Sequence, residues 1–180
     1  MNPLFIENSI GEIIKKIENG ELTPLDVWNT SLSNIQALES QYFAWVTFGN
    51  HERGFWLYPD GDRTGQSPRL LEHIPVGIKD IYNTADYPTQ MGSPLWKDFT
   101  PGNDARAVFN IKRQGGVVIG KTVTAEFAVH ALEKTLNPYD VTKTPGTSSS
   151  GSAVAIALGQ VPFAVGSQTA GSIVRPASFC

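Results

Sequence analysis

The sequence contains few of the residues that mark several common protein classes. Its single cysteine, Cys180, is the last residue, so no disulfide can form within the chain. No apolar run reaches the ~18 residues that a membrane-spanning helix needs. The three histidines, His51, His73 and His130, lack the spacing of metal ligands. The N-terminus has no basic segment followed by an apolar one, so no secretory signal is expected. We therefore expect a cytoplasmic protein that needs no metal, no cofactor and no membrane.

Charged residues are also scarce. They make up 17% of the 180 residues and leave a formal net charge of −3, while hydrophobic residues make up 41%. This balance is typical of a globular chain and argues against disorder. The sequence has no basic stripe of the kind that binds nucleic acid, so no nucleic-acid partner is expected. The length suits one domain with one sizeable hydrophobic core.

Helix start signals dominate the first forty residues. Asn8 or Ser9 can cap a first helix. A second start combines Thr23 as N-cap, Pro24 at the first helical position and Asp26 at the third. Spacing of three and four residues predicts the inward face of this second helix, which comprises Leu25, Trp28, Leu32 and Ile35.

The following residues predict a sheet. Residues 42–48 have the composition of a strand, residues 50–70 that of a polar surface loop, and residues 74–81 form an apolar run. Asp104 is then expected to cap a helix, and residues 117–121 form another apolar strand. Two apolar strands joined by a helix indicate a parallel pair covered on both faces. The predicted fold class is therefore α/β, with a mixed, largely parallel sheet flanked by helices.

The chemistry is concentrated after Thr144, where serine and glycine become frequent. The stretch 144–152 leads into a predicted helix of small residues over 150–158. Such a helix start places free N–H groups beside several hydroxyls. A serine run can instead be a flexible connector, but the apolar run that follows favours the helix. We interpret Ser149 and Ser150 as donors at the start of this helix, with Ser150 also able to cap it.

The chain resembles the amidase signature family in a series of ordered sequence blocks. These blocks are Pro75–Asp80, Gly120–Thr122 with Glu126–Phe127, Asn137–Pro138, Thr144–Gly146, Ser167–Ser172 and Pro176–Cys180. The resemblance runs from about residue 8 to the end. It implies one amidase signature domain over residues 1–180 that is incomplete at its C-terminus. Residues 1–40 would be its helical N-terminal segment and residues 41–180 part of its α/β core.

The resemblance also implies a catalytic triad without histidine. The family uses a lysine, a serine that follows a cis peptide bond, and a nucleophilic serine; the matching residues here are Lys79, Ser148 and Ser172. Ser148 and Ser172 are 24 positions apart, as in the family. A serine hydroxyl attacks only when a base takes its proton, and a lysine is such a base only when burial lowers its pKa. Lys79 ends a predicted buried strand, which suits that role, and Ser148 would relay the proton.

The turn before Ser172 is expected to bind the oxygen of the tetrahedral intermediate. Its donors would be the backbone N–H groups of Thr169, Ala170, Gly171 and Ser172. Gln168 and Ala170 stand where the family usually has aspartate and glycine, which indicates a particular branch, and we interpret that branch as free-standing amidases.

Some interpretations stay open at this point. Arg175 could bind a substrate carboxylate or form a structural ion pair, and Cys180 is interpreted as a packing residue in preference to a nucleophile. The expected function is hydrolysis of a small-molecule amide through a serine acyl-enzyme. One alternative is the glutamine-hydrolysing subunit of a tRNA-dependent amidotransferase. Another is a catalytically silent remnant that binds or oligomerises. The expected partners are a second copy of the chain or the missing C-terminal half.

Overall fold

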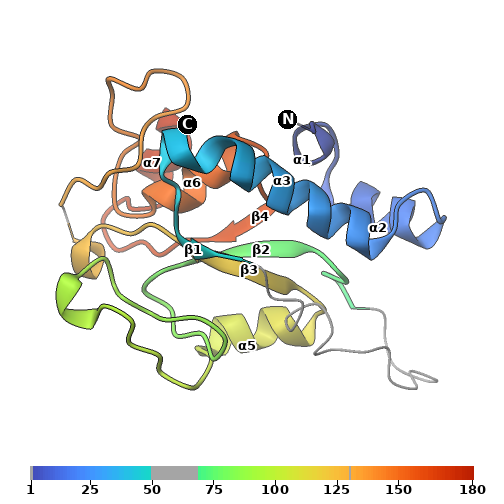
Figure 1. Ribbon diagram of the computed structural model, residues 1–180, viewed down its shortest axis with the longest axis horizontal. Coiled ribbons are helices and arrows are strands. Elements are labelled where there is room, and N and C mark those ends of the chain that lie inside the picture. The colour runs from blue at the N-terminus through green and yellow to red at the C-terminus, as the bar shows by residue number, and fades with distance from the viewer. Residues whose placement is uncertain (1, 50–68, 130) are drawn as a thin grey trace.

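The computed structural model describes residues 2–49, 69–129 and 131–180 of the chain (Figure 1). Its helices are α1 (Leu4–Glu7), α2 (Ile10–Glu18), α3 (Pro24–Tyr42), α5 (Arg106–Arg113), α6 (Ser150–Ala157) and α7 (Val174–Phe179), with short 3-10 helices η1 (Pro94–Trp96) and η2 (Glu126–Ala128). Its strands are β1 (Trp45–Phe48), β2 (Pro75–Lys79), β3 (Val117–Thr122) and β4 (Phe163–Val165). The predicted loop over 50–70 lies almost wholly outside the described residues, and so do His51 and His130.

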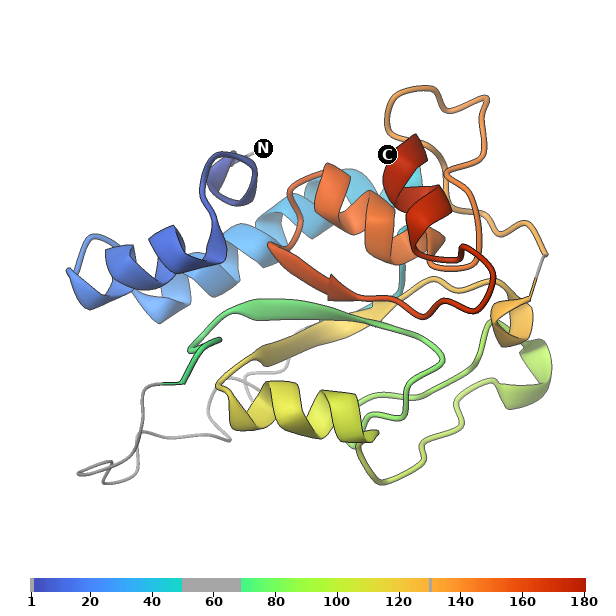
Figure 2. The ribbon, with the colours of Figure 1, turned by 180° about the vertical axis from the view of Figure 1, so that it is seen from behind.

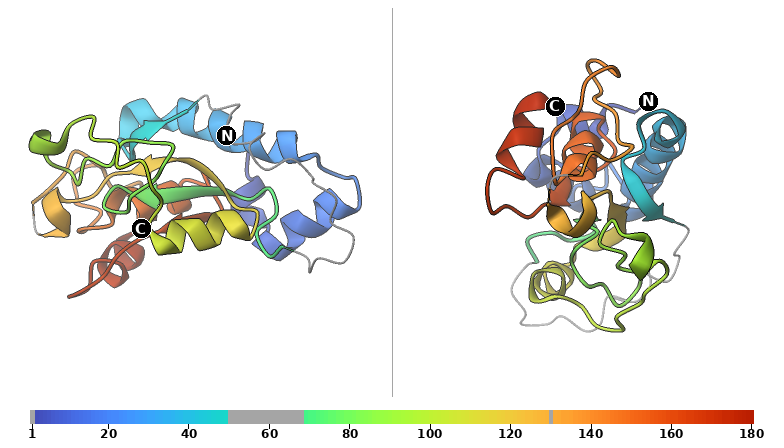
Figure 3. Two further views of the ribbon diagram at one scale, coloured as in Figure 1. Left: turned by 90° about the horizontal axis from the view of Figure 1, so that it is seen from below. Right: turned by 90° about the vertical axis from the view of Figure 1, so that its left-hand side faces the viewer.

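The four strands form one sheet in the order β1-β3-β2-β4. Strand β2 is parallel to both β3 and β4, and β1 runs antiparallel to β3. The predicted mixed, largely parallel sheet is therefore confirmed. Helices α3 and α6 cover one face and α5 covers the other, as Figure 2 and the end-on view in Figure 3 show. This arrangement brings the C-terminal ends of β2 and β4 to the edge where the serine-rich segment begins α6.

The N-terminal helices begin where the capping residues predict. Ser9 caps α2 in a capping box with Glu12, and Thr23 caps α3 in a capping box with Asp26. The buried residues of α3 are Val27, Trp28, Ser31, Asn34 and Ile35. The placement of Leu25 on the inward face was wrong, because its side chain is 51% exposed. The buried stripe is centred on Val27 and Ser31, and Leu25 lies about 200° around the helix from Val27.

Two predicted element boundaries also need correction. Strand β1 begins at Trp45 and not at residue 42, because Tyr42 is the last residue of α3 and Phe43 ends the helix in the left-handed region with φ 52°. Asp104 does not cap α5. The N-cap is Ala105, without a side-chain hydrogen bond, and the Asp104 carboxylate instead accepts from Lys112 Nζ at 2.9 Å. An ammonium from the same helix thus holds the carboxylate away from the first turn.

Helix α6 packs unusually close to the sheet because its first turn contains glycine. The Gly151 N–H donates to the Val123 carbonyl at 3.2 Å. A Cβ atom at Gly151 would lie closer than 3.0 Å to the Ala44 carbonyl oxygen and the Val123 nitrogen. This contact presses the serine-rich start of α6 against the ends of β1 and β3. Among the described residues, no helix combines the length and hydropathy needed to cross a membrane.

Candidate active site

The amine of Lys79 lies in a group of hydroxyls at the end of β2. Its side chain is fully buried, and Nζ lies 2.7 Å from Ser148 Oγ, 2.9 Å from Ser149 Oγ and 2.8 Å from Ser167 Oγ. The Ser167 carbonyl oxygen is also within 3.5 Å. Three polypeptide segments therefore converge on one amine: the end of β2, the start of α6 and the residues just after β4.

Burial lowers the pKa of Lys79 from its ordinary value of 10.5 to about 8. The cause is desolvation, since the charged amine loses water that neutral hydroxyls replace incompletely. No carboxylate of the described residues forms an ion pair with Lys79 to oppose this shift. The uncharged fraction of Lys79 at neutral pH is thus much larger than that of an ordinary lysine, as a base requires.

The serine-rich segment places Ser148 beside this amine. The peptide bond between Thr147 and Ser148 is cis, at the position where the resemblance to amidases implies one. Ser148 is fully buried, and its carbonyl accepts from the Ala125 N–H at 3.1 Å. The backbone of this segment is therefore fixed to the residues that follow β3, on the side of Lys79.

Ser149 has a different place from the one expected of it. It is the N-cap residue of α6 but makes no capping bond with its side chain, and Ser150 is the first helical residue. The Ser149 hydroxyl donates to the Ser167 carbonyl at 3.2 Å and accepts from the Ser167 N–H at 3.3 Å. It therefore joins the start of α6 to the end of β4 and contacts Lys79 directly. A Cβ at Gly166 would come to 3.0 Å from this hydroxyl, which explains the glycine there.

Ser172 lies in the turn before α7 and is 6% exposed. Its carbonyl accepts from the Ser149 N–H at 3.1 Å, which places its backbone against the serine-rich segment. Ser148, Ser167 and Ser172 line one cavity of about 410 Å³. Within the described part of the chain, the Ser172 hydroxyl makes no hydrogen bond, so it is free to meet a ligand.

The turn that contains Ser172 also presents unused N–H groups. Those of Thr169, Ala170, Gly171 and Ser172 have no hydrogen-bond acceptor among the described residues. Gly171 has φ +110°, which is unfavourable for residues with a side chain. This backbone geometry lets successive amides of the turn lie close to one another beside the cavity.

Gln168 closes this turn. Its side-chain oxygen accepts from the N–H groups of Ile173 and Val174, both at 2.9 Å, and so ties the start of the turn to the start of α7. A carboxylate at this position could accept the same two hydrogen bonds, so the neutral amide keeps the acceptor without adding a negative charge. The exposed Arg175 donates to the Ala170 carbonyl at 2.9 Å and forms no ion pair with a described residue.

Part of the cavity wall is apolar. This part is made by Ile81, two residues after the end of β2, and by Phe127, Ala128 and Val129 in and next to η2. No charged side chain of the described residues lines this cavity. A neutral, partly apolar ligand would therefore fit between this wall and the hydroxyls.

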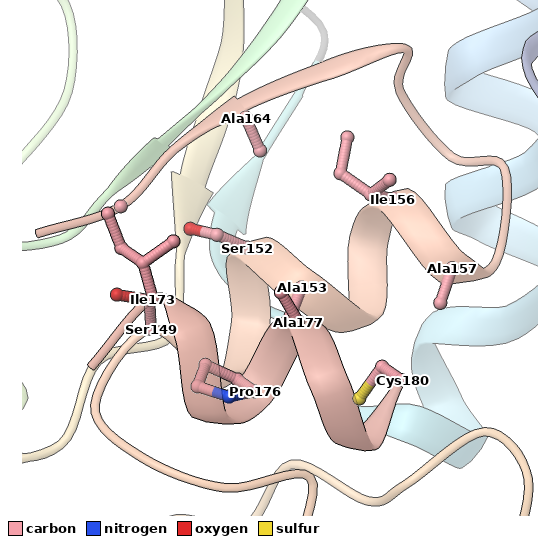
Figure 4. Close-up of a pocket in the computed structure, with 11 residues that line it drawn as sticks. Ser149, Ser152, Ala153, Ile156, Ala157, Ala164, Ile173, Pro176, Ala177 and Cys180 are labelled. Carbon is pink, nitrogen blue, oxygen red and sulfur yellow. The ribbon is translucent and has the colours of Figure 1, made fainter. Parts of the chain in front are cut away.

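A second cavity of about 310 Å³ lies between α6, α7 and β4 (Figure 4). Its lining is mostly alanine, isoleucine and proline, with Cys180 at its rim. Burial raises the pKa of the Cys180 thiol to about 11, so the thiol is not ionised near neutral pH. Its Sγ lies 3.8 Å from the Pro145 carbonyl oxygen, which fits a packing residue. Among residues 2–49, 69–129 and 131–180, no group of three or more potential ligands could hold a metal ion.

Sequence reasoning proposed Lys79, Ser148 and Ser172 as the triad but missed the contacts of Ser149 and Ser167 with the amine. The structure brings Lys79 and Ser148 into hydrogen-bond contact and places Ser172 on the same cavity. Ser167 stands at the start of the last glycine-rich block, which was the available signal. No local pattern shows that its hydroxyl points at a lysine 88 residues earlier.

Comparison with known proteins agrees with this geometry. The family model described as Amidase matches residues 26–180. The chain belongs to the amidase family. A glutamyl-tRNA(Gln) amidotransferase subunit of Rhodopirellula baltica is 40% identical to this amidase chain over 96% of the chain. The alignment covers 36% of that relative's length.

Solved amidase structures are similar as well. The peptide amidase from Stenotrophomonas maltophilia superposes with a TM-score of 0.87 at 31% identity, covering 96% of this chain and 38% of that one. A glutamyl-tRNA(Gln) amidotransferase subunit from Thermotoga maritima gives a TM-score of 0.81 at 30% identity, covering all of this chain and 38% of that one. The amidase chain therefore spans little more than a third of the length of these relatives.

Proposed function

We propose that this chain provides the catalytic centre of an amide-bond hydrolase. Ser172 would be the nucleophile, Lys79 the base and Ser148 the proton relay between them. The observation that carries the proposal is a buried amine surrounded by hydroxyls, next to a turn of free backbone N–H groups. The first arrangement activates an alcohol, and the second stabilises the oxyanion that its attack creates.

Counting donors and acceptors assigns a direction to the relay. An uncharged lysine amine has two hydrogens and one lone pair. The Ser149 hydrogen is used by the Ser167 carbonyl, so the Ser149 oxygen can accept one hydrogen from Lys79. The Ser167 oxygen can accept the other. The lone pair then faces Ser148, which lies 2.7 Å away and can donate to it. Ser149 and Ser167 thus orient the base toward the relay serine.

The chemistry follows in two halves. Ser172 Oγ attacks the amide carbon while its proton passes to Ser148 and the Ser148 proton passes to Lys79. The carbonyl oxygen becomes an oxyanion beside the N–H groups of residues 169–172. Collapse breaks the C–N bond, and Ser148 returns a proton to the leaving nitrogen. Water then attacks the ester on Ser172 by the same route, which releases the acid and restores the serine.

This scheme requires a hydrogen bond between Ser172 and Ser148. The Ser172 hydroxyl makes no hydrogen bond to a described residue in the structure, whereas the bond between Ser148 and Lys79 is formed. Catalytic hydrogen bonds are often long in unliganded enzymes and shorten when substrate binds. We expect the carbonyl of a bound amide, held by the turn, to bring the two hydroxyls together.

Labelling with a fluorophosphonate tests the nucleophile and the base. We expect a single labelled residue, Ser172, and no labelling of the Ser172→Ala or Lys79→Met variants. Ser178→Ala and Lys143→Met are matched controls at exposed positions outside the cavity and should label as the parent chain does. A folded parent chain that stays unlabelled would refute the proposal and support the catalytically silent binding module.

A second candidate function is supported by the 40% identity to an amidotransferase subunit. In that case the amide would be glutamine, and the chain would work with partner subunits. Ammonia release from L-glutamine and from a peptide with a C-terminal amide distinguishes the two. A free-standing amidase would hydrolyse the peptide amide. The cavity favours this outcome, because no charged side chain of the described residues lines it. Preferential release from glutamine would favour the amidotransferase function.

A further inference from the structure

A buried ion pair lies directly beside the candidate base, and no step of the proposed chemistry uses it. Asp80 follows Lys79 in the chain, and Lys121 lies on the neighbouring strand β3. Both side chains are fully buried, and Lys121 Nζ is 2.9 Å from Asp80 Oδ1. Buried pairs of this kind contribute little stability on balance, because desolvation of both charges offsets their attraction. Their presence next to a catalytic group therefore requires another explanation.

The pair fixes the segment that follows β2. Lys121 Nζ donates to the Pro88 carbonyl at 3.1 Å and to Thr89 Oγ1 at 2.8 Å. Asp80 Oδ2 accepts from the Gln90 N–H at 3.1 Å. Both charged groups thus bind residues 88–90 and hold them against the ends of two strands.

That segment supports the apolar wall of the cavity. The Met91 N–H donates to the Asp80 carbonyl at 2.9 Å, and the Met91 carbonyl accepts from the Phe127 N–H at 2.8 Å. Phe127 lines the same cavity as Ser148 and Ser172. The chain from the ion pair to the cavity wall is therefore continuous.

The pair also places two opposite charges at the end of the sheet where Lys79 lies. Lys121 is in register with Ile78, and consecutive side chains of a strand point to opposite faces, so the Lys121 side chain lies on the face of the sheet opposite to that of Lys79. Strand β4 and helix α6 carry no charged residue. The two carboxylates of α3 accept hydrogen bonds elsewhere: Asp26 from the N-cap of its own helix and Glu39 from the N–H groups that begin β1. The remaining acidic residue of these elements is Glu126, in the first turn of η2.

We propose that Asp80 and Lys121 are positioning residues for Lys79: a charge-balanced pair that holds residues 88–90 in place and leaves no net charge beside the base. This inference rests on the proposed role of Lys79. An unbalanced carboxylate next to Lys79 would favour the ammonium form and make the amine a poorer base near neutral pH. Lys121 pairs with that carboxylate, so the two residues together add no net charge beside Lys79.

Titration of the lysine side chains by NMR tests the pair without requiring catalysis. The full chain is labelled with 13C at the lysine ε-carbon, and the Lys79 signal is assigned from the Lys79→Met variant. We expect Lys121→Met to raise the Lys79 pKa by about one unit, because Asp80 is then unpaired. Adding Asp80→Asn to Lys121→Met should return the Lys79 titration to that of the parent chain.

Lys112→Met is the matched control. Lys112 is also a buried lysine paired with carboxylates, Asp86 and Asp104, but it lies on α5 away from the cavity. This variant should leave the Lys79 titration unchanged. If Lys121 has a purely structural role, Lys121→Met would lower the stability of the chain. It would then cause no shift of the Lys79 pKa that Asp80→Asn reverses.

The outcomes separate this inference from the proposed function. Two results would overturn the proposed role of the pair: an unchanged Lys79 titration in folded Lys121→Met, or a shift of the Lys79 pKa that Asp80→Asn does not reverse. Should Lys121→Met not fold, the double variant decides: it must fold and titrate as the parent does. A parent chain whose Lys79 titrates as expected but whose Ser172 resists fluorophosphonate contradicts the hydrolase and not the charge balance.

Discussion

The substitution Lys79→Met should change how the stability of the chain depends on pH. Lys79 is fully buried, and its pKa is lowered from 10.5 to about 8 by desolvation. A difference of one pKa unit between the folded and unfolded states corresponds to about 1.4 kcal/mol of stability. Keeping the Lys79 amine charged therefore disfavours the folded state by about 3 kcal/mol. Methionine has a similar shape and no proton to lose.

Whether stability rises or falls with pH depends on which state, folded or unfolded, binds more protons. Between pH 8 and pH 10.5 the unfolded chain keeps the lysine proton while the folded chain has released it. The unfolded state then binds more protons, so the free energy of unfolding rises with pH across this window. Below pH 8 the penalty is constant. From pH 7 to pH 10 the contribution of Lys79 should increase stability by about 2.5 kcal/mol.

Urea unfolding at pH 7 and pH 10 measures this effect as a difference between two proteins. The parent chain should gain about 2.5 kcal/mol relative to Lys79→Met over that interval. Buried Tyr87, whose pKa is raised by desolvation, is common to both and cancels. Lys143→Met, at an exposed position, should behave as the parent does. If the parent and Lys79→Met show the same pH dependence within about 0.5 kcal/mol, the amine is not desolvated as the structure indicates.

Three further substitutions test other parts of the architecture. Gly151→Ala should lower the free energy of unfolding by about 1–3 kcal/mol, since the new methyl group meets backbone atoms next to the sheet. Gly11→Ala is the control in the same urea assay, because a methyl group at Gly11 would meet no atom within 4 Å. Gln168→Ala should slow fluorophosphonate labelling of Ser172 by about tenfold or more, because two N–H groups lose their acceptor. Gln168→Glu should restore much of the labelling rate. Equal labelling rates in the parent chain and both variants would contradict the role of Gln168 in closing the turn. Thr23→Ala should cost about 1 kcal/mol through loss of the α3 cap, measured by thermal unfolding, and Thr23→Ser should cost little by comparison.

Local sequence signals located much of the fold. Capping residues placed the starts of α2 and α3, and the apolar runs placed β2 and β3 as a parallel pair. These features depend on residues within one turn or one strand, where periodicity and side-chain chemistry are decisive. The start of β1 was misplaced because the helix before it extends to Tyr42, and propensity alone does not decide between an aromatic helix end and a strand.

The candidate site was predictable only in part, for a related reason. The blocks of sequence identified Lys79, Ser148 and Ser172, whose catalytic roles stay predictions until they are tested. The contacts of Ser149 and Ser167 with Lys79 were not predicted, because they join residues 70 and 88 positions apart. No pattern in a single sequence records such contacts, since any serine in a glycine-rich loop looks like a turn residue.

The sequence by itself determined where helices and strands begin and which residue types can carry amide chemistry, because these follow from short-range hydrogen bonding and burial patterns. Tertiary structure alone decided that the amine has three hydroxyl neighbours, that Gln168 closes the turn before Ser172, and that Asp80 is balanced by Lys121. Those outcomes depend on how strand ends and helix starts meet at one edge of the sheet. The same packing removes water from Lys79, and the loss of water is what shifts its pKa toward that of a base.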